Sequence, residues 1–292
     1  MAEPTRPLCD YQGYDYEGGF WPGREYEDAV ERIALRRMLP TSGGRLVEIG
    51  AAFGRLADLY IRYERVILLD PARSQLQNAR QRLGSDGRFI FVVGDVYHLP
   101  LSTNSFDVAL TVRVLHHLSD VTAAFREIHR ILLPEGRYVL EYANKRNLKE
   151  VIRHLLGRSR RRPFSPEPVE YSPLHYSFHP SYVEKGLRGA HFRLEKGLAV
   201  SSLRLNLLKR LVPDSWLIRA DGLLQGPTAS LKLAPSLFLL TRAQKAGPTS
   251  EALFRCPQCG NEELDESPTA LLCGQCGRSW PIEDGIYYFG AR

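Results

Sequence analysis

The sequence predicts a doubly wound α/β domain built on a mostly parallel sheet, followed by a small C-terminal module. Short, continuously apolar runs alternate with stretches of helical periodicity over residues 45–156. Such runs are typical of parallel strands that helices cover on both faces. The chain has 292 residues, which is enough for one large domain and a module. Four of its five cysteines lie within residues 256–276, and they mark the module.

The expected strands are the apolar runs themselves. They occupy 45–50, 65–70, 88–95, 106–112 and 136–142, and two later strands are expected at 191–203 and 236–242. Helices are expected at 24–39, from about residue 56, at 72–83, at 120–133 and at 147–156. Residues 157–182 contain five prolines and predict a long exposed excursion. The sheet should therefore have seven strands.

The domain limits follow from these patterns. Residues 1–242 should form the main domain, with an N-terminal segment (1–40), a core (45–145) and the excursion with the late strands (146–242). Residues 243–253 are expected to be a linker between two separate cores, and residues 254–292 the module.

Composition narrows the class of protein. Apolar residues make up 43% and charged residues 25%, as in a soluble globular protein. No run of about 18 uncharged apolar residues exists, which argues against a membrane span. The N-terminus lacks the apolar core of a signal peptide, and the cysteines are paired locally, so a cytoplasmic protein is expected. The net charge is +6, of which residues from Glu251 onward carry −4 and the rest +10.

The first strand ends in a glycine-containing turn, Glu48-Ile49-Gly50-Ala51-Ala52-Phe53-Gly54. Glycine lets a backbone approach a ligand closely because no Cβ intervenes. Asp70 ends the second strand, where a carboxylate can accept both hydrogen bonds of a ribose diol. Asp95 lies at the end of the third strand, where a carboxylate can accept a hydrogen bond from the amino group of an adenine. Singly, Asp70 and Asp95 could instead cap the next helices.

The segments VEIGAAFGR, VILLDPA, VVGDVYHLPLSTNSFDVALTVRVLHHL and EIHRILLPEGRYVLE together resemble class I S-adenosylmethionine-dependent methyltransferases, specifically the type 11 group, over about residues 25–145. The resemblance implies a Rossmann-like methyltransferase fold and methyl transfer from S-adenosylmethionine. It also implies the cofactor-binding residues: Glu48, Gly50, Ala51 and Gly54 for the methionine part, Asp70 and Pro71 for the ribose, Asp95 and Val96 for adenine, and Thr111 and Val112 beside the sulfonium.

The sequence departs from the family pattern at Ala52, which stands at the middle glycine of the usual Gly-x-Gly-x-Gly. Alanine keeps this turn feasible if its φ is negative. The absence of G-x-G-x-x-G disfavours a nicotinamide oxidoreductase, since pyrophosphate needs an uncluttered helix N-terminus. A second hypothesis is a degenerate fold that acts as a scaffold through its C-terminal module, and Ala52 is its only support.

Methyl transfer from an activated sulfonium needs mainly in-line positioning, so the sequence does not name a catalyst. Weak candidates beyond strands four and five are His116, Glu141, Tyr142, His175 and His179. By the family resemblance, the histidine pair at 116–117 is more often a packing and surface pair than a catalytic one. The Tyr-rich start (Tyr11, Tyr14, Tyr16, Trp21) could cover the cofactor as a lid or simply pack on the sheet.

A basic stretch at 145–162 could hold a phosphate-bearing acceptor or RNA through Arg158, Arg160, Arg161 and Arg162. A solvated charged loop explains it equally well. No RNA-binding module is recognisable in the first 250 residues, which slightly favours a small-metabolite acceptor over RNA.

The C-terminal module contains Cys256-Pro-Gln-Cys259 and Cys273-Gly-Gln-Cys276. Two such knuckles complete a tetrahedral four-thiolate site with no open position, so a structural zinc is expected and Cys9 should be uninvolved. Disulfides or free thiols are the alternative. The tail LLCGQCGRSWPIEDGIYYF resembles the small zinc-binding partner subunits of tRNA, ribosome and release-factor methyltransferases, over about residues 255–289. That resemblance implies docking or substrate presentation.

Overall fold

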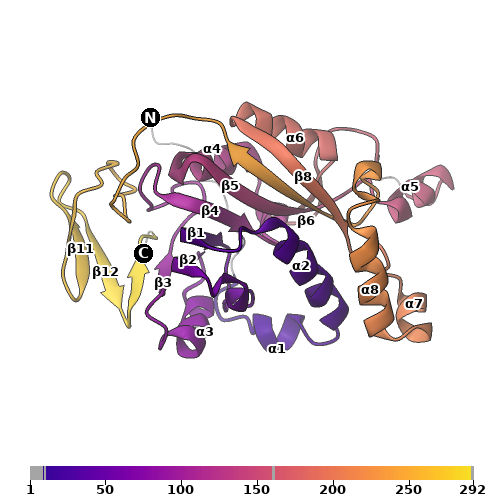
Figure 1. The fold of residues 1–292 in the computed structure, drawn as a ribbon, viewed down its shortest axis with the longest axis horizontal. Helices are drawn as coiled ribbons and strands as arrows, with labels where there is room; N and C mark the ends of the chain where they lie inside the picture. The colour runs from indigo at the N-terminus through magenta and orange to yellow at the C-terminus, as the bar shows by residue number, and fades with distance from the viewer. Residues whose placement is uncertain (1–8, 10, 160–161, 291–292) are drawn as a thin grey trace.

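The computed structural model describes residues 9, 11–159 and 162–290. Its centre is a sheet in the order β10-β11-β12-β13-β3-β2-β1-β4-β5-β9-β8 (Figure 1). The strands of the main domain are β1 (Gly43–Ile49), β2 (Tyr63–Asp70), β3 (Phe89–Val93), β4 (Phe106–Thr111), β5 (Leu132–Ala143), β8 (Phe192–Val200) and β9 (Ser236–Ala243). The first five are parallel, whereas β9 runs antiparallel to both β5 and β8. The expected seven-stranded, mostly parallel sheet is confirmed.

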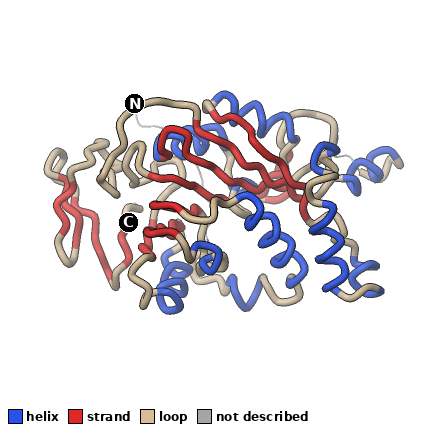
Figure 2. The backbone as a smooth tube through the Cα atoms, viewed as in Figure 1, coloured by secondary structure: helices blue, strands red, loops and turns tan. Residues whose placement is uncertain are grey.

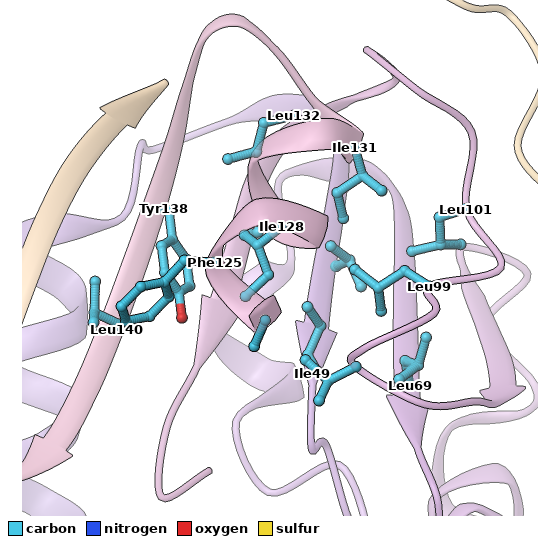
Figure 3. Packing of buried hydrophobic residues seen from close by; sticks show 14 of the residues in the cluster. Ile49, Leu69, Leu99, Leu101, Phe125, Ile128, Ile131, Leu132, Tyr138 and Leu140 are labelled. Atoms are coloured by element: carbon cyan, nitrogen blue, oxygen red, sulfur yellow. The ribbon is translucent and has the colours of Figure 1, made fainter. Parts of the chain in front are cut away.

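Helices cover both faces of this sheet because successive strand residues point to opposite sides. Ile49 and Leu69 pack with α4 (Val121–Ile131) and α6 (Pro180–Gly189), while Leu46 and Leu68 pack with α2 (Glu25–Met38) and α3 (Arg73–Leu83). Figure 3 shows the first layer, in which Phe125, Ile128 and Ile131 of α4 meet strand residues. The remaining helices are α1 (Tyr16–Phe20), α5 (Leu148–Leu155), α7 (Asn206–Leu211) and α8 (Asp214–Leu224).

Two segments differ from the sequence-based expectation. The helix expected from about residue 56 is a single 3₁₀ turn, Ala57–Tyr60. The excursion is partly ordered: β6 (Val169–Ser172) and β7 (His175–Ser177) form a hairpin, and α6 begins at Pro180 with His179 as its N-cap. Proline at the first helical position is favourable, because its missing N–H would have no partner there. Within the described residues, the helices are too short or too polar to cross a bilayer.

The C-terminal module is an extension of the main sheet, which differs from the expected separate core. Its strands are β10 (Leu264–Glu266), β11 (Ala270–Cys273), β12 (Ser279–Glu283) and β13 (Ile286–Tyr288). β13 pairs in parallel with β3, with Ile286 opposite Phe91, and the module's hairpins continue from that edge (Figure 2). Phe254, Trp280 and Phe289 belong to the same buried cluster as the α4 face of the sheet. The two parts therefore share one core.

The expected linker also lies against the main domain. The guanidinium of Arg45 donates to the carbonyls of Glu251 and Ala252 at 2.7 and 3.0 Å. Asn104 Nδ2 donates to the Pro248 carbonyl at 3.0 Å. These contacts hold residues 248–252 in place, so this segment is not a free spacer.

Candidate functional site

A cavity of about 930 Å³, including the solvent at its mouth, opens at the carboxyl ends of β1, β2 and β4. The order in which successive strands join the sheet reverses at this point: β2 and β3 lie on one side of β1, and β4 and β5 lie on the other. In α/β sheets ligands bind at such a switch point. Of the residues implied by the family resemblance, the cavity is lined by Glu48, Gly50, Ala51, Asp70, Pro71, Val96 and Val112. The strand ends thus bring most of the expected set together.

The turn after β1 depends on left-handed backbone. Gly50 has φ of 74° and Gly54 has φ of 73°. A Cβ at Gly50 would lie 2.3 Å from Val114 Cγ2, so only glycine fits there. Gly54 lies behind the cavity, where a Cβ would meet Leu83 and Leu68 at 2.9 and 3.2 Å. Gly50 is therefore needed at the cavity wall and Gly54 for packing of the turn on its neighbours.

Ala52 also adopts a left-handed conformation, with φ of 46°. The condition of a negative φ, under which alanine would fit this turn without strain, is therefore not met, and the turn keeps the backbone that a glycine would adopt. A non-glycine residue in this region pays a conformational penalty of about 1 kcal/mol or more.

Replacing Ala52 by glycine should therefore stabilise the protein by up to about 1 kcal/mol, because relief of the left-handed alanine outweighs the added freedom of the unfolded chain. Chemical unfolding of the two proteins measures the change. Ala51→Gly is the matched control: Ala51 is 3% exposed and lacks a positive φ, so its replacement should destabilise. A loss of stability in Ala52→Gly would show that the turn is not strained.

Asp70 links the turn after β1 to the turn after β2. Its Oδ2 accepts a hydrogen bond from the Ala52 N–H at 2.8 Å, and its Oδ1 accepts one from the Ala72 N–H at 2.9 Å. Burial raises the pKa of Asp70 to about 6, against the opposing effect of these two hydrogen bonds. Each carboxylate oxygen retains capacity for a second donor, which suits a ligand diol.

Glu48 is 4% exposed, and its Oε2 is buried without a hydrogen-bond partner. Burial raises the pKa of this carboxyl to about 7, against the opposing effects of the Tyr60 hydroxyl and the Arg55 guanidinium, and the nearby Asp70 adds to the rise. A buried carboxylate oxygen without a donor is costly in the empty protein and needs a cationic or donor partner. The position therefore fits a ligand ammonium group.

Besides Gly54, Asp95 and Thr111 of the expected set do not line the cavity. The Asp95 carboxylate turns back onto its own loop, accepting from the Tyr97 N–H at 2.8 Å and contacting His98 Nδ1 at 3.1 Å. Thr111 is fully buried, and its hydroxyl lies 2.7 Å from the Tyr138 hydroxyl. Their proposed contacts with adenine and the sulfonium stay predictions.

The N-terminal segment covers the cavity. Tyr11, Tyr16 and Trp21 line it, whereas Tyr14 is 46% exposed outside it. The segment is fastened to α3: Gln75 Nε2 donates to the Tyr14 carbonyl at 2.6 Å, and the Gly13 N–H donates to Ser74 Oγ at 2.8 Å. Between the two interpretations of these aromatics, the geometry corresponds to a cover over the cavity.

A buried ion network supports this cover, and the sequence analysis did not anticipate it. Glu31 of α2 pairs with Arg55 at 2.8 Å and with Arg113 at 2.5 Å. Arg55 lies 3.9 Å and Arg113 lies 5.0 Å from the Trp21 ring centroid. Both arginines line the cavity, so they place positive charge beside it. The only sequence signal was arginine at two strand-end turns, AAFGR and TVRV.

The weak catalytic candidates separate in space. Glu141 is buried away from the cavity; its Oε2 accepts from the Arg113 N–H at 2.9 Å and its Oε1 from the Ser236 hydroxyl. Tyr142 lines a different cavity, and His179 caps α6. His116 does not line the main cavity, but its neighbour His117 does. Burial lowers the pKa of His117 to about 4, so this ring is neutral at physiological pH.

The four module cysteines form the second candidate site. Their Sγ atoms all lie within 4.8 Å of one another. Cys256 and Cys276 are 3.7 Å apart, and Cys259 and Cys273 are 3.5 Å apart. Four ligands at about 2.3 Å from a tetrahedral zinc are about 3.8 Å from each other, so the set fits this ion. Gly260 and Gly277, with φ of 81° and 70°, close the two knuckles.

Two of the four arginines of the basic stretch, Arg160 and Arg161, lie outside the described residues. Neither Arg158 nor Arg162 lines the main cavity.

Comparisons with known proteins agree with this geometry. Residues 47–140 match the model of a family described as a methyltransferase domain. Methyltransferase GfsG of Streptomyces halstedii is 28% identical over 134 residues, which is 42% of this chain and 48% of that protein. The 27-O-demethylrifamycin SV methyltransferase of Amycolatopsis mediterranei is 30% identical over 138 residues, 44% of this chain and 51% of that protein. The chain spans about half the length of these curated relatives.

Solved structures extend the likeness beyond the matched region. A chain from the complex between the Haloferax volcanii Trm112 methyltransferase activator and its candidate methyltransferase is 20% identical, with a TM-score of 0.55. The likeness covers 79% of this chain and 95% of that chain. The main domain therefore has the Rossmann-like fold of class I methyltransferases.

Proposed function

We propose that the protein transfers a methyl group from S-adenosylmethionine to a small acceptor. The observation that carries this proposal is the pair of buried carboxyl groups, Glu48 and Asp70, that line a cavity located at the strand switch point. Pyrophosphate would repel both groups, whereas the ammonium and the ribose hydroxyls of S-adenosylmethionine are donors that suit them. When bound, the sulfonium supplies an activated methyl group.

The residues of this chain would position that cofactor. Glu48 would accept from the ammonium group, Asp70 from the ribose hydroxyls, and the Gly50 backbone would allow close approach. Val96 would contact the adenine. The Asp95 carboxylate would accept a hydrogen bond from the adenine amino group once its loop reorients. The buried Arg55 and Arg113, on the same wall, would attract the methionine carboxylate.

The part of the cavity where the methyl acceptor would bind favours a small molecule as the acceptor. The wall beyond Val112 consists of Val114, His117 and Leu118, and Tyr11 closes it from above. An apolar, covered wall suits a compact organic acceptor better than a nucleic-acid backbone, which needs an open basic groove. A scaffold role is less well supported, because the Ala52 turn keeps a glycine-like φ of 46° and the cavity persists.

Calorimetry tests the proposed cofactor. S-adenosylhomocysteine should bind the purified protein and NAD should not. Incubation of the protein with methyl-labelled S-adenosylmethionine and fractionated cell extract should then label small molecules. Label in RNA would identify the other acceptor class, and binding without any label would support the scaffold alternative.

Asp70→Ala should weaken S-adenosylhomocysteine binding by about 1.5–3 kcal/mol, or roughly 10- to 150-fold, because ribose hydroxyls would lose a charged acceptor. Calorimetry on a variant shown to be folded by circular dichroism measures the effect. Asp58→Ala is the control, since Asp58 is exposed in the 3₁₀ turn and does not line the cavity. Unchanged affinity in Asp70→Ala would mean that the ribose lies elsewhere.

For the module we propose a structural zinc held by Cys256, Cys259, Cys273 and Cys276. The sulfur separations fit a closed tetrahedral site, in which no position remains for catalysis. The zinc would stabilise the module strands that continue the sheet beyond β3. The module would serve docking or substrate presentation at that edge.

A further inference from the structure

A second cluster of potential metal ligands lies at the mouth of the main cavity. It consists of Cys9 in the N-terminal segment, His117 in the 3₁₀ turn Leu115–His117, and His175 at the start of β7. One ligand atom from each of the three residues lies within 4.8 Å of the others. Three segments that are far apart in the sequence therefore meet at this point.

Both histidines are oriented in the way that metal-binding histidines are. His117 Nδ1 lies 3.3 Å from the Leu174 carbonyl, and His175 Nδ1 lies 2.8 Å from the Pro173 carbonyl. A carbonyl oxygen can only accept, so each neutral ring carries its proton on Nδ1 and its lone pair on Nε2. Backbone carbonyls that fix the tautomer from behind are the usual outer-shell partners of metal-ligating histidine.

A fourth ligand position is also marked. The Tyr11 hydroxyl lies 3.1 Å from His117 Nε2. Two ligands of a tetrahedral zinc ion at about 2.0–2.2 Å are separated by about 3.3 Å, so an oxygen already lies where such a ligand belongs. Cys9, Tyr11 and His117 all line the cavity, which places this position at its wall.

We propose that Cys9, His117 and His175 bind one zinc ion, with the fourth position at the Tyr11 hydroxyl and open to the cavity. A thiolate and two imidazoles favour zinc over magnesium or calcium, which prefer oxygen ligands. Three protein ligands with one exchangeable position are the composition of catalytic rather than structural zinc sites.

Such an ion would have two effects. It would tie the N-terminal segment to the turn after β4 and to the β6–β7 hairpin, and so hold the cover over the cavity. It would also offer an oxygen or sulfur atom of an entering molecule a place to bind when Tyr11 moves away. The module cysteines lie beyond the β3 edge of the sheet and take no part in this site.

Metal analysis of the purified full chain tests the site without any activity measurement. The wild-type protein should contain about two zinc ions, and Cys9→Ser and His175→Ala should each contain about one. His179→Ala is the matched control: this histidine lies four residues from His175 and outside the cluster, so its zinc content should equal that of wild type. One ion in the wild type, retained in both cluster variants, would overturn the proposal.

X-ray absorption at the zinc edge of the wild-type protein provides a measurement that does not depend on the folding of a variant. Two sites together should give a first shell with both sulfur and nitrogen or oxygen. A shell of four sulfurs alone would overturn the proposal, because it would show only the module site. Neither result depends on whether the protein transfers methyl groups.

Discussion

Replacing Glu48 by glutamine is expected to raise the free energy of unfolding of the free protein by about 3 kcal/mol at pH 8 and by much less at pH 5. Burial raises the pKa of Glu48 from 4.5 to about 7 in the folded state. The folded protein therefore binds more protons than the unfolded chain between these two pH values, and its stability falls as the pH rises through that range. Glutamine cannot ionise and avoids this loss. Urea unfolding of both proteins at the two pH values measures the difference.

The same substitution should weaken S-adenosylhomocysteine binding by about 1.5–3 kcal/mol, because the ammonium would lose a charged acceptor. The wild type should bind about tenfold more weakly at pH 6 than at pH 8, since Glu48 must lose its proton first. In Glu48→Gln this pH dependence should become shallower. Calorimetry across this pH range compares the two proteins.

Glu31→Gln is the matched control for the stability change. Glu31 is equally buried, but it is paired with Arg55 and Arg113, so its replacement leaves two arginines without their partner and should destabilise the protein. The opposite signs of the two effects distinguish a carboxyl that lacks an ion-pair partner from one that is paired with two arginines. A loss of stability at pH 8 in Glu48→Gln would mean that its carboxylate has a stabilising partner in the free protein.

Much of the fold could be predicted because its signals are local. The apolar runs at 65–70 and 106–112 are buried on both faces and give the strands directly. Helix α6 was missed because it begins at Pro180, inside a proline-rich stretch where the sequence predicts a loop. Its buried Val183 and Leu187 are its only periodic signal.

The cavity was predictable to the extent that strand ends determine it. Glu48, Gly50 and Asp70 end two adjacent parallel strands, so their meeting follows from the topology. The direction of a side chain beyond a strand end depends on its loop, as the hydrogen bond from the Tyr97 N–H to Asp95 shows. The Glu31–Arg113 pair joins residues 82 positions apart on a helix and a loop, which no spacing rule reveals.

Contacts between residues far apart in the sequence account for the other differences between the predicted and the observed structure. Cys9 gave no signal in the sequence because its neighbours His117 and His175 come from a turn and a hairpin that only the folded chain brings together. The pairing of β13 with β3 was equally hidden, since β13 spans only Ile286–Tyr288. A short strand of this kind is stabilised by the sheet edge that it joins.

That pairing determines what loss of the module zinc should do. Cys273→Ser should lose the zinc of the module, unfold residues from about 255 onward, and also lower the stability of the main domain by at least about 3 kcal/mol. Removal of Phe254, Trp280 and Phe289 from the shared core exposes large apolar side chains, and burial of each contributes about 1.5–3 kcal/mol. β3 would also lose its edge partner, including the Phe289 N–H bond to the Val93 carbonyl at 2.9 Å.

Hydrogen exchange locates this effect. Amides of residues 89–93 in β3 should exchange faster in Cys273→Ser, and cofactor affinity should fall because Gly94 and Val96 follow this strand into the cavity wall. Leu272→Ser is the matched control: Leu272 precedes Cys273 on β11 but is 45% exposed, so zinc content and β3 protection should stay at the wild-type level. If the module amides lose protection in Cys273→Ser while those of β3 keep theirs, the module folds as a separate unit and the shared core contributes nothing to the main domain.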